Sequence, residues 1–136
     1  MNTLEDISDV FSTLHDGVME ECEGTYEELW LKVRCTYLTE FIGKDFDYFY
    51  LKLLLVKEFY FQEYGGKVQH IYDTIDLAHI DIEMLYSKVE SESVTVDCTK
   101  GILFLQCNSV EVFDQEKKPV SASALFDIAK LYWSRK

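Results

Sequence analysis

Few side chains in this sequence have the types and spacing that catalysis needs. His15 and Asp16 form the kind of pair found in metal phosphohydrolases, but such sites require further ligands. Only His70 and His79 remain, both in or near an irregular segment and without the spacing of metal ligands. An Asp–Gly step is more commonly a turn. We therefore predict no metal site.

Patterns for nucleophilic or phosphate chemistry are equally scarce. The sequence holds no Gly-x-Ser-x-Gly, no Cys–His pair at a familiar spacing and no Gly-rich phosphate loop, and Gly65–Gly66 lacks the following Lys-Ser/Thr. Carboxylates are too numerous for an acid–base pair to be singled out. We predict a protein that is not an enzyme, with no catalytic residue and no cofactor. A pocket near residues 65–79 that binds or converts a small molecule stays open as an alternative.

The cysteines and the apolar runs bear on the compartment. Four cysteines lie far apart with no C-x-x-C pair, all in segments with apolar periodicity, where free thiols behave as small hydrophobes. They are Cys22, Cys35, Cys98 and Cys107. Reduced thiols are expected, although two disulfides in an exported form remain open. The first residues lack a basic region, and the run Leu53–Val56 is far too short to cross a membrane. We expect a cytoplasmic protein with no membrane partner.

Charge is the most unusual property of the chain. The net charge is −12, and no lysine or arginine precedes Lys32, although nine acids do. Those acids are Glu5, Asp6, Asp9, Asp16, Glu20, Glu21, Glu23, Glu27 and Glu28. The remaining chain is nearly balanced, with 13 basic and 16 acidic residues, and its basic residues form no stripe. This pattern disfavours nucleic acid and favours a basic protein partner, or else a solvated face that keeps the protein dissolved.

The elements that must position these residues are predicted to form a single α+β domain, residues 1–136. We expect mainly an antiparallel hairpin sheet with one N-terminal and one C-terminal helix. A 3.6-residue apolar period from Leu4 to Leu14, with Thr3 and Asp6 at its start, predicts the first helix, and Gly17 ends it. From Leu29 to Tyr37 alternate residues are apolar, which is typical of a half-buried strand.

The segment Phe46–Phe61 is apolar on both faces. Such a strand is either covered on both sides or forms a subunit contact, so a homodimer through this segment is an alternative. Sixteen residues would reach about 50 Å, too long for one flat strand here. We therefore expect a bulge or a strong coil within it.

The remaining segments read as hairpins and a closing helix. Gly65–Asp76 is the best loop candidate, and the residues Ile80–Tyr86 resume alternation. Val94–Cys98 and Ile102–Cys107 are predicted to pair around a turn at Lys100–Gly101. Ser121 or Ser123 can cap the last helix.

A family resemblance follows from two of these features. The first helix runs into Leu14–His15–Asp16–Gly17, and the closing helix ends with Leu131–Tyr132–Trp133. This arrangement resembles small acidic immunity proteins of bacterial toxin–immunity loci and related uncharacterised domains. The resemblance implies a protein that binds and blocks a toxin enzyme, often a basic nuclease, without a cofactor. It carries over no contact residue.

These observations converge on a non-catalytic protein-binding domain. Five acids straddle one predicted turn at Gly24, with two aromatic side chains beside them that could anchor a partner. The predicted partner-binding residues are Glu20, Glu21, Glu23, Tyr26, Glu27, Glu28 and Trp30.

Overall fold

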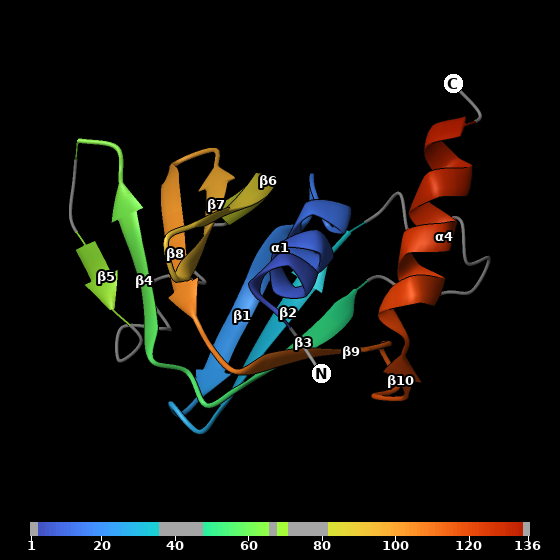
Figure 1. Cartoon of the computed structure of the whole chain (residues 1–136), viewed down its shortest axis with the longest axis horizontal. Coiled ribbons are helices and arrows are strands. Elements are labelled where there is room, and N and C mark those ends of the chain that lie inside the picture. The colour runs from blue at the N-terminus through green and yellow to red at the C-terminus, as the bar shows by residue number, and fades with distance from the viewer. Residues whose placement is uncertain (1–2, 36–47, 66–67, 71–81, 135–136) are drawn as a thin grey trace.

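Residues 3–35, 48–65, 68–70 and 82–134 are described by the computed structural model. Over these residues the chain is α+β, as predicted, with an antiparallel sheet of ten strands and a helix at each end (Figure 1). The strands are β1 (Val18–Gly24), β2 (Glu28–Arg34), β3 (Phe49–Leu54), β4 (Glu58–Glu63), β5 (Val68–His70), β6 (Ile82–Glu90), β7 (Ser93–Cys98), β8 (Gly101–Gln106), β9 (Ser109–Phe113) and β10 (Pro119–Val120).

The sheet consists of two halves. The first half has the order β10-β9-β3-β2-β1 and the second half β6-β7-β8-β4-β5. They meet where Val18 and Met19 of β1 pair with β6. Two chain segments, 49–63 and 101–113, also run through both halves, because β3 continues into β4 and β8 into β9. The halves are therefore joined by shared strands as well as by one short pairing.

The bulge or strong coil expected within the long apolar strand takes the form of a bend between two separate strands. Leu55 separates β3 from β4 and has a positive φ of 52°, in the left-handed region. Around this bend the amide of Lys57 donates to the carbonyl of Gln106 (2.7 Å) and that of Asn108 to Leu54 (2.9 Å). Bending both segments together lets their apolar residues face one core. That core includes Phe49, Leu51, Leu53, Phe59, Phe61, Leu103, Leu105, Val110 and Val112.

Helix α1 (Leu4–Thr13) covers this core where the halves diverge (Figure 1). It begins at a capping box between Thr3 and Asp6, as the sequence predicted. Its stripe of Ile7, Val10 and Phe11 is buried, and the helix packs mainly on β6 and β7. A one-faced helix is stable here because the curved sheet receives its apolar stripe.

The end of α1 differs from the prediction that glycine supplies the freedom to turn. Asp16 has the positive φ (66°), a conformation that Asp adopts more readily than most residues. Gly17 is required instead for close approach, since a Cβ there would lie 2.6 Å from the carbonyl oxygen of Leu14. The amide of Asp16 donates to Met84 on β6, which fixes the turn to the sheet.

Helix α4 (Ala122–Ser134) stands at one edge of the molecule (Figure 1). The Ser121 hydroxyl accepts from the amide of Ala124 (3.1 Å), so Ser121 is the cap. Leu125 and Ala129 are buried, whereas Leu131 is exposed. The helix is thus attached along one narrow stripe.

Two local predictions were wrong. The expected loop Gly65–Asp76 contains the short strand β5, which pairs with β4. The alternation expected from Ile80 to Tyr86 is interrupted by a bulge between Met84 and Tyr86. Because of this bulge the Met84 side chain is buried and the Tyr86 side chain is exposed. The sequence Gly43-Lys44-Asp45 also predicts a hairpin turn, and these residues lie outside the described part of the chain.

All four cysteines are buried, and none of them forms a disulfide. No helix in the described parts of the chain is long and apolar enough to cross a membrane.

Candidate functional site

The acids predicted to form one cluster behave differently along the β1–β2 hairpin. Near its base, Glu20 forms an ion pair with Arg34 (3.7 Å) and Glu21 with Lys32 (3.8 Å). These basic residues come from the partner strand β2. The base of the hairpin is therefore electrically compensated, which the count of charges in the first 31 residues could not reveal.

The tip of the hairpin is different. Residues 23–28 are all exposed, and within the described chain no ion pair involves Glu23 or Glu27. Thr25 Oγ1 accepts from the amides of Glu27 (3.2 Å) and Glu28 (3.4 Å), and the Thr25 amide donates to the Glu28 carbonyl. The turn is therefore held by its own hydrogen bonds before any partner arrives.

The tip lies against the bend between β3 and β4. The amide of Leu55 donates to the carbonyl of Glu27 (3.0 Å), and that of Val56 to the carbonyl of Tyr26 (2.6 Å). Tyr26 and Leu55 are large apolar side chains with 49% and 55% of their surface exposed. We call the surface formed by Glu23, Tyr26, Glu27, Glu28 and Leu55 the tip surface.

A second feature, which sequence reasoning did not find as a group, is an aromatic cluster on the outer face of the first half. We call Trp30, Tyr48, Tyr50 and Phe113 the aromatic platform. The ring of Trp30 lies 6.0 Å from Tyr50 and 5.3 Å from Phe113, and Tyr48 lies 5.3 Å from Tyr50. The rings come from β2, from β9 and from the start of β3, so only the strand order brings them together. Trp30 was predicted as a contact residue, and the platform is where it lies.

Three lysine ammonium groups lie over these rings. Lys32 Nζ is 4.1 Å from the Tyr48 ring centre, and Lys52 Nζ is 5.3 Å from Phe113. Lys117, in the turn between β9 and β10, is 5.0 Å from the Trp30 ring and 4.9 Å from Tyr50. Each distance is within the range of cation–π attraction.

Carboxylates surround the platform. Trp30 Nε1 donates to Glu28 (3.0 Å), and Lys52 pairs with Glu111 (3.4 Å). The pKa of Tyr50 is raised, first by its hydrogen bond with Tyr48, then by burial and by the nearby charges that include Glu21. Carboxylates therefore lie beside the platform together with its three lysines.

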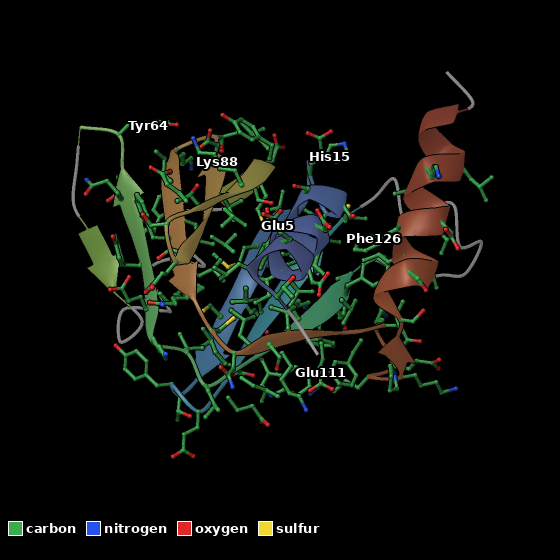
Figure 2. The ribbon with its side chains drawn as sticks, viewed as in Figure 1. Glu5, His15, Tyr64, Lys88, Glu111 and Phe126 are labelled. Atoms are coloured by element: carbon green, nitrogen blue, oxygen red, sulfur yellow. The ribbon has the colours of Figure 1, made fainter. Side chains whose placement is uncertain are left out.

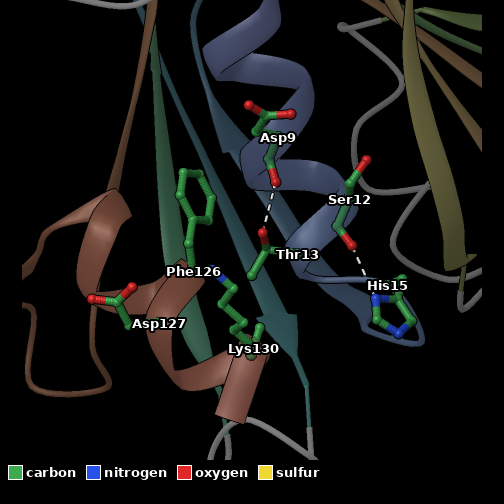
Figure 3. Close-up of a pocket in the computed structure, with 8 residues that line it drawn as sticks. Asp9, Ser12, Thr13, His15, Phe126, Asp127 and Lys130 are labelled. Atoms are coloured by element: carbon green, nitrogen blue, oxygen red, sulfur yellow. Dashed lines mark hydrogen bonds between the residues drawn. The ribbon is translucent and has the colours of Figure 1, made fainter. Parts of the chain in front are cut away.

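A groove of about 500 Å³ lies elsewhere, between α1 and α4 (Figure 3). It is lined by Asp9, Ser12, Thr13, His15, Phe126, Asp127, Ala129 and Lys130. His15 Nδ1 lies 2.9 Å from the Ser12 carbonyl, while the Ser12 hydroxyl bonds with Ser87 (2.7 Å). The Ser12 hydroxyl is thus directed to Ser87, and His15 Nδ1 to a backbone carbonyl.

The groove and the outer face of the first half are separate regions. His15 and Glu111, which belong to the groove and to that outer face, lie on opposite sides of the molecule in Figure 2. Within the described chain, no cluster of three or more potential metal ligands was found.

The alternatives from the sequence fare differently. The proposed pocket at residues 65–79 lies mostly outside the described residues. In the segment proposed for a homodimer, Phe49, Leu51 and Leu53 are in the core, so only the opposite face is available for contact. The side chains of His70 and His79, which were considered as metal ligands, lie outside the described part.

Comparison of the chain with protein-family models, curated proteins and solved structures found no match.

Proposed function

We propose that this chain is a non-catalytic binding protein whose tip surface docks onto a basic protein partner. The observation that carries the proposal is the pair of exposed anchors, Tyr26 and Leu55, set among the exposed carboxylates of Glu23, Glu27 and Glu28. Protein interfaces concentrate their affinity in a few large side chains surrounded by a polar rim.

The backbone at Leu55 supports this role. A bulky residue with positive φ is strained, and an exposed leucine gains little from folding. Glycine would adopt this conformation without strain. A side chain kept despite both costs is most simply explained by a contact that it makes outside the chain.

Charge supports the choice of partner. Glu23, Glu27 and Glu28 surround the anchors, and the chain carries a net charge of −12. Such a field speeds the approach of a positively charged protein and slows that of nucleic acid. The resemblance to small acidic immunity proteins adds a class of partner, a basic toxin enzyme that the tip surface would block. The four reduced, buried thiols fit a cytoplasmic setting for this binding.

The decisive experiment reverses charge at the tip and at a matched place. Tagged wild type, Glu23→Lys/Glu27→Lys and the control Glu90→Lys/Glu92→Lys are used to isolate partners from the native cell extract. The control changes net charge equally on the β6–β7 hairpin, where both acids are exposed. We expect a basic protein that binds wild type and control but not the tip variant. With the purified partner, the association rate should fall as salt rises.

Leu55→Gly separates binding from folding. The change relieves backbone strain and adds flexibility to the unfolded chain, and these terms oppose each other at about 1 kcal/mol each. We therefore expect unchanged stability in urea denaturation together with weaker partner binding. A tip variant that retains every basic partner, or a Leu55→Gly protein that binds normally, would remove the proposal.

A further inference from the structure

The three lysines over the aromatic platform are not equivalent. Lys32 and Lys52 are largely covered and each forms an ion pair, with Glu21 and Glu111 respectively. Lys117 is exposed, and no ion pair involves it within the described chain. Its ammonium group lies over Trp30 and Tyr50 without a carboxylate to hold it there.

The position of Lys117 is set by its turn. Its amide donates to the Asp114 carbonyl (2.9 Å), and the Asp114 carboxylate accepts from the amides of Glu116 and Lys118. The backbone of this turn is thus fixed, while the long side chain of Lys117 can leave the rings without disturbing it. Exposed cation–π contacts are weak, so such a departure costs little.

The rings beneath Lys117 are built to receive a cation. Trp30 is held by its hydrogen bond to Glu28 and by an edge contact with Tyr50. Glu23 is directly opposite Trp30 in the strand register. Two aromatic faces with carboxylates at their rim attract a positive group by both the ring quadrupole and charge.

We propose that the faces of Trp30 and Tyr50 form a site for an arginine side chain of the basic partner, and that Lys117 occupies this site in the free protein. The inference rests on the proposed function and extends its surface. Glu28 belongs to the tip surface and also bonds to Trp30, so the two regions are continuous. Arginine is the fitting occupant because its planar guanidinium stacks on aromatic faces and is less strongly hydrated than an ammonium group.

The test uses Trp30 fluorescence in a Trp133→Phe background, which leaves Trp30 as the sole tryptophan. The probe is a capped peptide, Gly-Ser-Arg-Ser-Gly, and its control carries neutral citrulline in place of arginine. We expect the arginine peptide to change the fluorescence of Trp30 and the citrulline peptide to leave it unchanged. A lysine peptide should bind more weakly than the arginine peptide.

Removal of the resident cation gives the sharper result. Lys117→Gln should raise affinity for the arginine peptide about two- to fivefold, the equivalent of one exposed cation–π contact. Lys118→Gln is the matched control, since Lys118 is in the same turn but pairs with Glu116 instead of the rings. Equal responses to arginine and citrulline, or equal affinities of Lys117→Gln and wild type, would overturn the inference.

Failure here is distinguishable from failure of the binding function. If the arginine peptide does not bind to the rings but the tip variant still loses its partner, the proposed cation site is wrong and the proposed binding function stands. If the peptide selects the rings while the tip variant keeps every partner, the platform binds cations but the tip surface is not the interface.

Discussion

The two halves of the sheet share the segments 49–63 and 101–113, yet their outer faces carry different chemistry. In the first half, aromatic rings are interleaved with lysines and carboxylates from four strands and a turn. In the second half, Tyr60 and Phe104 stack on each other at 4.8 Å, and the residues Tyr64 and Tyr86 are more than half exposed.

This difference teaches that one strand can serve two purposes along its length. The inner residues on both sides of the bend are uniformly apolar, because one core requires them. Residues on the outer face do not have to be apolar. The first half can therefore present charged and aromatic side chains there, while the second half mainly supports the fold. Three measurements test this division.

The largest effect at neutral pH is expected at Gly101, where β8 begins in the second half. A Cβ there would collide with the Gln62 carbonyl and lie 2.8 Å from Phe61. Gly101→Ala should lower the free energy of unfolding by roughly 3 kcal/mol, since overpacking forces backbone shifts. The control Gly65→Ala has φ of 66° but open space, and should cost only about 1 kcal/mol. Urea denaturation measures both, and equal costs would show that the close β4–β8 approach is not what requires glycine.

An intermediate effect is expected from one cysteine in each half. Burial raises the pKa of Cys22 and of Cys98 from 9.0 to about 12, and the charges of Glu23 and Asp97 add to it. The folded pKa exceeds the unfolded one, so this stabilising contribution is complete below pH 9 and is lost as the pH rises toward 12. Each thiol should reduce stability by about 1.4 kcal/mol per pH unit in that window.

Cysteine variants isolate this effect from other titrating groups. Cys22→Ala and Cys98→Ala should each flatten the alkaline dependence of unfolding by the equivalent of one proton. A slope that stays the same in either variant would mean that the thiol ionises as easily in the folded protein as in the unfolded one.

The smallest effect concerns Thr95 on the outer face of the second half. Its hydroxyl is buried, and the structure shows no hydrogen-bond partner for it within the described chain. Thr95→Val should raise the free energy of unfolding by roughly 1 kcal/mol, because a buried unpaired hydroxyl is destabilising. Thr25→Val in the tip turn is the opposite case. The Thr25 hydroxyl accepts hydrogen bonds from two backbone amides, so its removal should lower the free energy of unfolding. If both substitutions destabilise, Thr95 must have a partner such as bound water.

Local pattern was sufficient to predict much of this fold. The alternation from Leu29 to Val33, the capping box at Thr3 and the Lys100–Gly101 turn are each set by neighbours in sequence, and the structure confirms them. The bend at Leu55 was expected because a straight strand would have been too long, but its position was not predictable. Bulges at Met84 and in β1 were missed because they change which face a residue occupies without changing the composition.

The candidate site could be predicted only in part. The acidic tip was visible as a run of glutamates around Gly24. The neighbouring Leu55 could not be found in this way. Its contact with the hairpin tip depends on the β2–β3 register, which pairs Glu28 with Leu54. The compensation of Glu20 and Glu21 by β2 likewise depends on register. Sequence thus located the charged segment, and pairing between distant strands determined what surrounds it.

The pairing of β3 with β9 also has a consequence for synthesis of the chain. Tyr50 leaves the ribosome long before Phe113, which follows only after β4 to β8 have been made. Until then, β3 lacks its second neighbour and the rings of Trp30 and Tyr50 lack both Phe113 and Lys117. Such non-local pairing slows folding, so the nascent chain presents an unfinished strand edge until β9 has been made.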